Sequence, residues 1–437
     1  MMVDKPKLSG YRWVVLAVVC LVCILANYMQ YQVSALAVYL MPMFGIDEAG
    51  FSMLLLMPML TAVFLSIPMG TLGDRIGPKK VVSACMVVAV LGGFLRTFGD
   101  SFALQMVSMF MLGAGISALN ANLIKIFSVW FMDKAQVAMG FFFGSAGVGV
   151  ICAQMVAPLF GSVFMSYLSA AIALTVVAVL WLLLLKDAPE GVEAPRGGES
   201  PVKYFKVAAK SRNVWLIALS YGFSMAACTA FAGFVPQALI ISCGVEPVTA
   251  GLIASCAAFG SIVGSVVGPA ICNRLGKWKP YLVVTIVVGT LLMVYFWYGV
   301  IMSGSIPSLP ALMAVMVLSG AFGAINGPIV QAMPYALPEI RGKYAGSAGG
   351  LISTVGLLCS YFIPVAVSAV AVGSYVMNLG LESLVFLLSV GFILLIPELG
   401  PKGSIARQIA EREAAGSPDA DPMAVDAKEP EAVPVRA

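Results

Sequence analysis

Twelve long apolar runs, separated by short polar segments, dominate the pattern of the chain. Each is long enough to cross a bilayer as a helix, which takes about 20 residues. The runs are continuous and do not alternate between apolar and polar positions, which argues against a membrane β-barrel. The pattern therefore predicts an all-α membrane protein with twelve transmembrane helices. The runs lie near 13–39, 51–71, 80–98, 102–124, 137–160, 166–185, 214–241, 249–271, 280–302, 309–331, 345–370 and 379–397.

Composition points the same way. Of the 437 residues, 60% are hydrophobic and only 11% are charged, and the mean hydropathy is +0.98. A soluble protein of this length has no core large enough to hide so much apolar surface. The lipid bilayer is therefore the expected surrounding of most of the chain.

The basic residues indicate an orientation. With the N-terminus placed in the cytoplasm, every lysine and arginine except Arg96 falls in a cytoplasmic segment. The outer loops instead carry acidic residues, among them Asp47, Asp100 and Glu246. This asymmetry follows the positive-inside rule and predicts a multi-pass protein of the cell membrane with both termini cytoplasmic. The net charge of +4 reflects this topology and does not suggest nucleic acid as a partner.

Two similar halves are expected. A polar segment with several prolines and glycines, 186–213, separates an N-terminal six-helix bundle, 1–185, from a C-terminal one, 214–398. The tail, 399–437, is rich in Ala, Pro, Glu and Asp, and we expect it to be largely disordered. At an offset of 206 residues, small and polar residues recur within apolar runs, which predicts two parallel six-helix pseudo-repeats. The matching pairs are Leu112 and Leu318, Ala118 and Ala324, Asn120 and Asn326, Gly140 and Gly346, Gly144 and Gly350, and Pro158 and Pro364.

A short basic turn stands between the second and third runs, from Gly70 to Lys80, and a decayed copy follows the eighth run, from Pro269 to Lys279. Its pattern, G-x-x-x-D-R-x-G-x-K-K, resembles the loop between helices 2 and 3 of the major facilitator superfamily. The resemblance extends over about 11–397, although Pro78 occupies a position that is usually basic. It implies a secondary transporter that works by alternating access and is functional as a monomer. The candidate gating-loop residues are Gly70, Asp74, Arg75, Gly77, Lys80 and Arg274.

Asp74 is the central residue of this loop. A carboxylate at the end of helix 2 can accept hydrogen bonds from the free N–H groups that begin helix 11, near Tyr344. Such a contact would latch the two halves together on the cytoplasmic side. The alternative is that the turn only anchors the topology. The copy has Asn273 in place of Asp74, so its latch should be weaker.

Polar residues within the apolar runs are the candidates for binding substrate, because they are costly in a bilayer and face a cavity or a partner. The family resemblance implies that helices 1, 4, 7 and 10 line the cavity. The alternative for each residue is an ordinary hydrogen bond between helices. The candidates are Asn27, Gln30 and Tyr31 in helix 1, Asn120, Asn122 and Lys125 in helix 4, Tyr221 and Ser224 in helix 7, and Asn326 and Gln331 in helix 10.

Lys125 is the one basic residue expected to reach the cavity, where it would attract anions. The alternative is a lysine that extends its amine to the membrane interface. Glu382, near the outer end of the last run, is expected at the interface. With no His in the chain and no carboxylate in the middle of a cavity helix, the sequence offers no obvious proton carrier. Cys20-x-x-Cys23 is interpreted as packing, and no metal or cofactor is expected.

Glycines mark two further helices. Small residues let helix backbones approach closely, so we expect helices 5 and 11 to pack against helices 8 and 2 across the two halves. These glycines are Gly140, Gly144 and Gly147 in run five and Gly346, Gly349, Gly350 and Gly356 in run eleven.

The segment from Leu337 to Gly342, ahead of the glycine-rich eleventh helix, is similar to that of facilitators for small anions such as cyanate, nitrate or monocarboxylates, although the cavity arginines typical of nitrate carriers are missing. The prediction is a transporter, not an enzyme, that moves a small solute, with a small organic or inorganic anion favoured. The alternatives are a drug or metabolite exporter and a non-transporting membrane sensor. The direction of transport and any coupling ion stay open.

Overall fold

The computed structural model describes residues 10–131, 135–186, 188–189, 208–337, 340, 345–371 and 374–403. These residues form helices and no strand, and twelve of the helices are long and apolar enough to cross a membrane. The prediction of an all-α protein with twelve transmembrane helices is confirmed.

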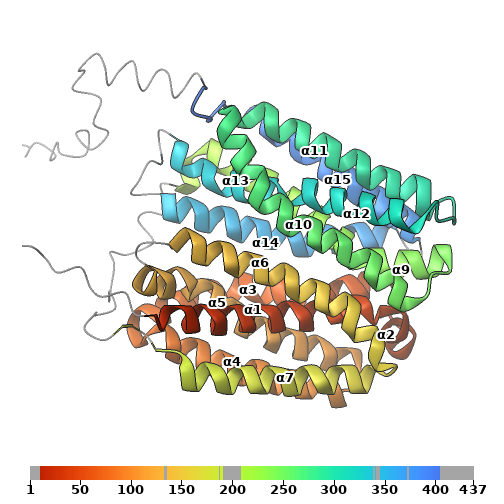
Figure 1. Ribbon diagram of the computed structural model, residues 1–437, viewed down its shortest axis with the longest axis horizontal. Helices are drawn as coiled ribbons and strands as arrows, with labels where there is room; N and C mark the ends of the chain where they lie inside the picture. The colour runs from red at the N-terminus through yellow and green to blue at the C-terminus, as the bar shows by residue number, and fades with distance from the viewer. Residues whose placement is uncertain are drawn as a thin grey trace, which may run out of the picture.

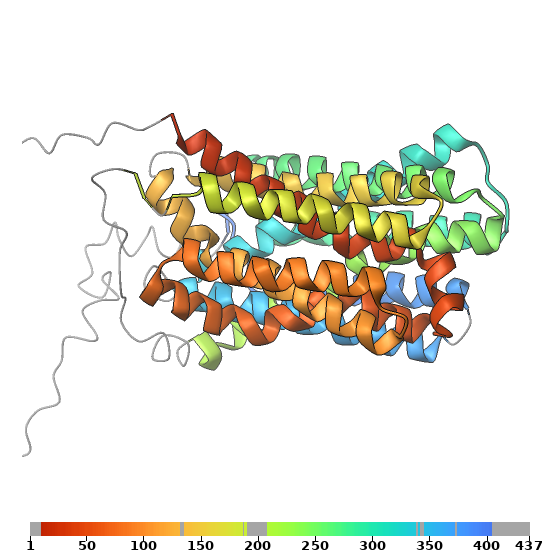
Figure 2. The same ribbon diagram turned by 90° about the horizontal axis from the view of Figure 1, so that it is seen from below.

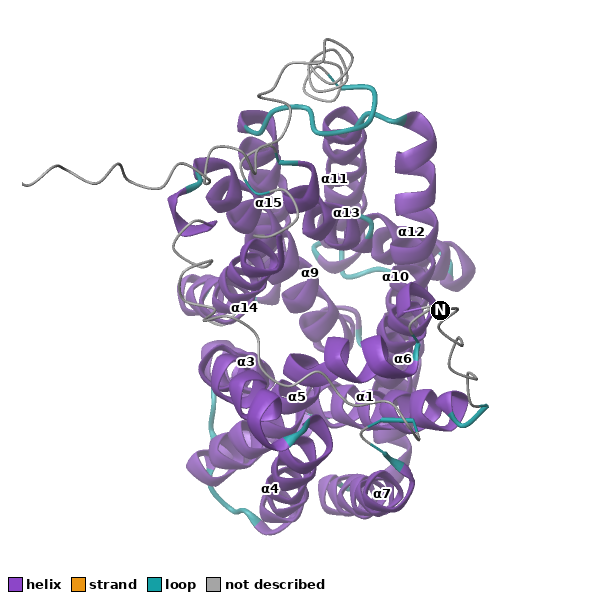
Figure 3. Cartoon of the chain, turned by 90° about the vertical axis from the view of Figure 1, so that its left-hand side faces the viewer, coloured by secondary structure: helices purple, strands orange, loops and turns teal. Residues whose placement is uncertain are grey.

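The helices form two groups, which we call the N-half and the C-half (Figures 1 and 3). The domain boundaries at 185, 213 and 398 stay predictions, since most of the segment between the halves is outside the described residues. The N-half contains α1 (Arg12–Ala35), α2 (Ala37–Phe44), α3 (Glu48–Ile76), α4 (Pro78–Phe98), α5 (Phe102–Trp130), α6 (Ala135–Val156), η1 (Ala157–Phe160) and α7 (Val163–Leu184). The C-half contains α9 (Arg212–Cys243), α10 (Pro247–Leu275), α11 (Trp278–Val294), η2 (Tyr295–Ile301), α12 (Leu309–Ala324), α13 (Asn326–Ala332), η3 (Met333–Ala336), α14 (Ala345–Val370) and α15 (Tyr375–Leu395).

The spanning helices run side by side along the long axis of the molecule (Figure 2), so the bundle has two ends. The basic end carries the α3–α4 and α10–α11 turns with their lysines and arginines, and the acidic end carries Asp47, Glu48, Asp100 and Glu246. Gly77 joins α3 to α4 with a φ of 96°, a conformation that side chains with a Cβ rarely adopt. Pro78 then begins α4, where its missing N–H has no helical partner to lose. This explains the glycine of the basic turn.

Two pairs of helices form the largest contacts between the halves, α3 with α14 and α6 with α10. These are the pairs predicted for helices 2 and 11 and for helices 5 and 8. Near the middle of α6, a Cβ on Gly147 would clash with Ile262 of α10. Nearer the basic end, Gly140 and Gly144 of α6 and Gly349 and Gly350 of α14 have no atom within 4 Å of where a Cβ would lie. The helices therefore approach each other closely only in their inner and acidic-end portions.

Hydrogen bonds between the halves follow the same division. Ser52 of α3 and Ser368 of α14 lie 2.8 Å apart at their hydroxyl oxygens, and Ser34 donates to the Gly233 carbonyl oxygen at 2.6 Å. Phe51 and Phe234 add a ring contact with centroids 5.4 Å apart. Across the described part of the chain, every hydrogen bond that joins the halves lies toward the acidic end. The structure is thus closed at the acidic end and parted at the basic end.

Arg96 is the one basic residue that the sequence placed outside the cytoplasmic segments. It lies in the last turn of α4, within the N-half, with 1% of its surface exposed. Its guanidinium donates to the Met29 carbonyl oxygen at 2.8 Å and to the Gln32 side-chain oxygen, and it stacks 4.1 Å from the Tyr167 ring centroid. Neutral acceptors and an aromatic face therefore hold this cation, and the hydropathy pattern gives no sign of them.

Candidate functional site: a cavity between the halves

A cavity of about 220 Å³ lies between the halves. Side chains of α1, α6, α9, α10, α11 and α12 line it, so both halves contribute to its wall. The lining is mainly apolar, and none of its side chains is charged. Its polar members are Tyr31, Gln154, Thr229, Ser261 and Ser319.

Two of these polar groups have a free hydrogen-bonding atom. Gln154, 1% exposed, donates its Nε2 to the Ser34 hydroxyl at 3.2 Å, while its Oε1 has no partner among the described residues. Ser319, also 1% exposed, has no partner in the described chain for its hydroxyl. Buried polar groups in proteins are nearly always hydrogen-bonded, so two unpaired atoms in residues of the cavity wall single out this part of the molecule.

The other polar groups lie around them. Tyr31 of α1 is buried, and its hydroxyl lies close to the Thr229 hydroxyl of α9. Ser261 of α10 donates to the carbonyl oxygens of Ala257 and Gly320 at 3.0 and 3.2 Å. Tyr31 and Thr229 thus present hydroxyls from opposite halves to the same space.

Glycines bring α10 and α12, two helices of the cavity wall, into direct contact. A Cβ on Gly260 or Gly264 would clash with backbone atoms of α12, and a Cβ on Gly320 would clash with the backbone of α10. These glycines let the two helices touch. The regular hydrogen bonding of the spanning helix is interrupted at Ile325, a bend that keeps helical dihedral angles, before α13 begins. Irregular backbone at membrane depth is tolerated where it is buried in protein or lines a cavity.

In helix 1, one of the three predicted binding residues lines the cavity, and it is Tyr31. Gln30 donates to the Leu55 carbonyl oxygen at 3.2 Å, and Asn27 donates to the Cys23 carbonyl oxygen of its own helix at 2.9 Å. Gln30 therefore makes the interhelical hydrogen bond that was its alternative interpretation.

The helix 4 candidates are outside the lining of this cavity. Asn122 is fully buried and donates to the Met69 carbonyl oxygen at 3.1 Å. Lys125 donates to the Gly70 carbonyl oxygen at 2.6 Å and approaches the Asn122 side-chain oxygen at 3.4 Å. Asn120 is exposed. Asn122 and Lys125 thus tie α5 to the last turns of α3.

The candidates in helices 7 and 10 also lie outside the cavity lining. Gln331 donates to the Tyr221 hydroxyl at 2.7 Å, which joins α13 to α9. Asn326, 2% exposed, accepts from Thr285 at 3.4 Å, and its Nδ2 has no partner among the described residues. Ser224 is buried.

The gating loop is described in part. Gly70 accepts the Lys125 hydrogen bond, Gly77 makes the turn, and Arg75, Lys80 and Arg274 are exposed. The Asp74 side chain and 341–344, where helix 11 was expected to begin, are outside the described residues. The latch between them therefore stays a prediction.

The second copy of the turn is held from within its own half. The Glu398 carboxylate accepts from the backbone nitrogens of Trp278 at 2.8 Å and Lys279 at 3.1 Å, and so caps the start of α11. The backbone N–H of Lys402 donates to the Gly276 carbonyl oxygen at 2.9 Å. Residues that follow the last span thus stabilise the α10–α11 turn.

Four of the polar lining residues were not among the predicted binding residues: Gln154, Thr229, Ser261 and Ser319. Hydroxyl residues in apolar helices commonly bond a carbonyl one turn back, so their position in the sequence does not single them out. The one available signal was the cluster of Ser319 with Gly320 and Gly323, small residues on one side of a spanning helix.

Glu382 differs most from its expected position. It is the eighth residue of α15, about 10 Å along the helix from its acidic end. It is 0% exposed, and neither carboxylate oxygen has a hydrogen-bond partner among the described residues. The expectation of an interfacial side chain is wrong, because α15 turns this position toward the other helices of the C-half.

Comparison with known proteins supports a transport function. The family model of the Major Facilitator Superfamily matches residues 18–364. A solved bacterial homolog of the human lysosomal transporter Spinster, in an inward-facing and unoccupied conformation, has a TM-score of 0.67 at 14% identity, with 89% of this chain and 95% of that chain covered.

Three curated relatives are similar over most of their length. The probable nitrate transporter NarT of Staphylococcus epidermidis is 25% identical, with 74% of this chain and 80% of the relative covered. The nitrite extrusion protein of Bacillus subtilis is 24% identical, with 80% and 85% covered. The probable sulfoacetate transporter SauU of Cupriavidus necator is 24% identical, with 86% and 90% covered. With its twelve spanning helices and a family match over most of its length, the chain belongs to the Major Facilitator Superfamily and is a membrane transporter, not an enzyme.

Proposed function

We propose that this protein is a secondary active transporter that moves a small anion by alternating access, with its basic end in the cytoplasm. The observation that carries the proposal is the cavity between the halves, where Gln154 and Ser319 each leave a buried polar atom unpaired. A solute bound there would contact both halves, and a change in their relative tilt would expose it to the other side.

The size of the cavity favours a small solute. Pockets for drug-sized ligands are about 300–1,000 Å³. The cavity here is about 220 Å³, which disfavours the drug-exporter alternative. Nitrate, nitrite and sulfoacetate, which appear in the names of the relatives, are all small anions.

The lining offers neutral donors for an anion. The hydroxyls of Tyr31, Thr229 and Ser319 can each direct an O–H toward a bound oxyanion. In the described part of the cavity wall no lysine or arginine takes part, so hydrogen bonding would hold the anion.

The state of the molecule fits one half of a transport cycle. At the acidic end the two halves are in contact. At the basic end α6 is separated from α10, and α14 is separated from α3. In this state the solute would exchange with the compartment at the basic end. The opposite state would require α6 to close on α10 and α14 to close on α3.

The test is uptake into proteoliposomes of labelled nitrate, nitrite and short carboxylates, with a cation and a neutral sugar as comparison solutes. Saturable uptake of an anion supports the proposal. Binding or transport of the cation or the sugar alone contradicts it.

A matched pair of variants tests the cavity. Tyr31→Phe removes one hydroxyl from the lining and should raise the KM for the anion by roughly fivefold to tenfold, the effect of losing one hydrogen bond. Tyr298→Phe makes the same change on an exposed residue of η2 and should leave the KM unchanged. Equal effects in both variants would remove Tyr31 from the site.

A further inference from the structure

The unpaired carboxyl of Glu382 requires an explanation. An ionised carboxylate buried in an apolar surrounding is strongly disfavoured unless a cation or hydrogen-bond donors compensate it. Neither oxygen of Glu382 has a donor among the described residues, and its side chain is 0% exposed.

The helices packed against α15 supply no compensating charge. They are α9, α11, η2 and α14, and the basic residues in their described parts are Arg212 and Lys279. Lys279 donates to the carbonyl oxygens of Leu394 and Ile396 at 2.6 and 3.0 Å, twelve or more residues beyond Glu382 and thus about 18 Å along the helix. Cys228 is the residue of α9 that lies near Glu382. Arg212 begins α9 sixteen residues earlier, about 24 Å away along the helix.

The other titratable groups of these elements are thiols and phenols, which carry no positive charge in either protonation state. None of them can neutralise a carboxylate. They are Tyr221, Cys228 and Cys243 of α9, Tyr281 of α11, Tyr295 and Tyr298 of η2, Cys359 and Tyr361 of α14, and Tyr375 of α15 itself.

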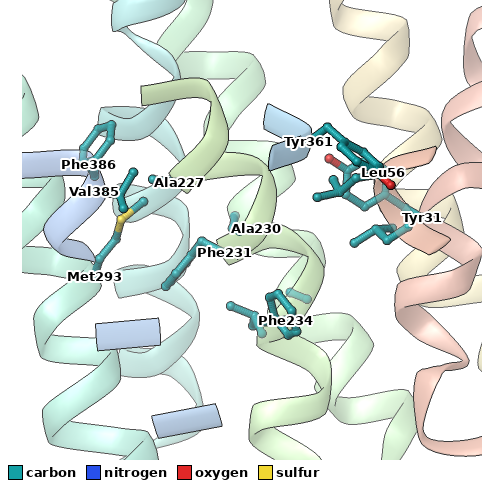
Figure 4. Close-up of a cluster of buried hydrophobic side chains, with 14 of the residues drawn as sticks. Tyr31, Leu56, Ala227, Ala230, Phe231, Phe234, Met293, Tyr361, Val385 and Phe386 are labelled. Carbon is teal, nitrogen blue, oxygen red and sulfur yellow. The ribbon is translucent and has the colours of Figure 1, made fainter. Parts of the chain in front are cut away.

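Glu382 is also a neighbour of the cavity. Cys228 lines the cavity and lies near enough to Glu382 for their charges to interact when both are ionised, and its sulfur is 3.6 Å from the Gly323 carbonyl oxygen. Met293 lines the cavity as well. Figure 4 shows Met293 beside Val385 and Phe386, which lie one turn beyond Glu382 on α15. Side chains of the cavity wall therefore lie on the side of α15 that carries Glu382.

From this geometry we infer that Glu382 is a proton-coupling site, whose carboxyl has to be protonated for an anion to occupy the cavity. This inference rests on the proposed function and adds a coupling ion to it. An anion in the cavity and an ionised Glu382 would repel each other across a low-dielectric wall. Anion binding therefore favours proton binding, and by reciprocity proton binding favours the anion.

The proton balance is simple. The Glu382 carboxylate takes one proton from water that reaches the cavity, and it returns that proton to water on the other side after the anion leaves. No other bond forms or breaks. A monovalent anion would thus move together with one proton, and its transport would be electroneutral.

The first experiment measures proton uptake on binding. Nitrate is added to the purified full-length protein in weakly buffered detergent solution, and the pH is recorded. At an alkaline pH, at which the free parent protein has lost the protonated-acid band of Glu382 from its infrared spectrum, the parent should take up about one proton for each nitrate bound, as reciprocal linkage requires. Glu382→Gln, which is neutral at every pH, should bind nitrate without proton uptake. Glu246→Gln, a change of an exposed acidic residue at the acidic end, should behave like the parent.

The second experiment uses proteoliposomes. An outside pH below the inside pH should drive labelled nitrate above its equilibrium concentration in the parent and in Glu246→Gln. In Glu382→Gln this accumulation should be lost, while exchange of nitrate for nitrate at equal pH continues. Accumulation in Glu382→Gln at the parental level would overturn the inference.

An infrared spectrum reports the protonation state of Glu382 without any transport. It keeps the inference testable if Glu382→Gln is inactive or if the parent moves no anion. The carbonyl band of a protonated carboxylic acid should be present in the parent and missing from Glu382→Gln. If the parent lacks this band, Glu382 is not protonated and the inference fails. If the band is present but no anion is bound or moved, the proposed function fails and the proton site stands.

Discussion

The ammonium group of Lys125 donates to the carbonyl oxygen of Gly70 at 2.6 Å and lies 3.4 Å from the Asn122 side-chain oxygen. Both partners belong to the contact between α3 and α5, beside the basic turn. Gly70 lies six residues before the end of α3, and a carbonyl oxygen has two lone pairs, so it can accept from Lys125 besides its helical N–H donor. Lys125 therefore acts, in this state, on the last turns of α3.

We expect Lys125→Ala to destabilise the protein and to leave anion affinity nearly unchanged. A hydrogen bond from a charged donor contributes about 1.5–3 kcal/mol, so the melting temperature in detergent should fall measurably. The KM for the transported anion should change by less than about twofold, or below ~0.4 kcal/mol.

The comparison variant is Lys277→Ala, which removes an exposed lysine from the α10–α11 turn and should leave the melting temperature unaltered. If Lys125→Ala instead keeps its melting temperature and loses about tenfold or more in affinity, Lys125 binds the anion directly.

Sequence reasoning at this scale proposed Tyr31, which lines the cavity, because its helix concentrates polar residues on one face. It could not separate Tyr31 from Gln30, since both are polar and adjacent, and only the packing of α3 shows that Gln30 bonds Leu55. Ser319 and Thr229 escaped it, because a hydroxyl in an apolar helix can be satisfied by its own backbone. Glu382 was misplaced because distance from a run's end does not show which neighbour the side chain faces.

At the scale of the elements, the packing around the glycines of α6 reflects the conformational state of the molecule. Gly147 is packed against α10, whereas Gly144, nearly one turn closer to the basic end, faces open space. If the halves close at the basic end in the opposite state, the basic portion of α6 has to approach α10. Gly144 would then need to remain small in that state although it has room in this one.

Gly144→Leu tests this expectation. The larger side chain should fit the present state, so the melting temperature should be similar to that of the parent. Transport should fall by about tenfold or more, because the side chain opposes closure at the basic end by at least ~1.4 kcal/mol. Phe143→Leu, on the neighbouring exposed residue, should transport normally. Normal transport by Gly144→Leu would mean that α6 and α10 stay apart there throughout the cycle.

The twelve spans could be predicted from the sequence, because a bilayer has no water to satisfy the backbone and only continuous apolar helices meet that requirement. The interruptions within these helices could not be predicted. The break at Leu36 between α1 and α2, the break at Ile325 and the π-helical η2 depend on contacts with other helices. Proline and glycine mark many positions in these runs, and most of them do not break the helix.

For the whole molecule, the orientation in the membrane is the property most open to test. Glu246 is exposed at the acidic end, and Lys277 is exposed at the basic end. The segregation of basic residues places the basic end in the cytoplasm. In intact cells, an impermeant thiol reagent should label Glu246→Cys and should not label Lys277→Cys until the cells are opened.

The parent protein is the control for that measurement, because its nine native cysteines are all free. Labelling of Lys277→Cys alone in intact cells would reverse the orientation.

The neutral wall of the cavity has a consequence for the choice among anions. An anion entering it leaves its hydration shell and gains hydroxyl hydrogen bonds, without a fixed cation to balance its charge. The energy of dehydration then sets the order of preference. Large, weakly hydrated monovalent ions would enter most easily, and compact or divalent ions would stay in water. At equal concentrations, thiocyanate should therefore compete well with nitrate for the cavity, whereas fluoride and sulfate should compete poorly.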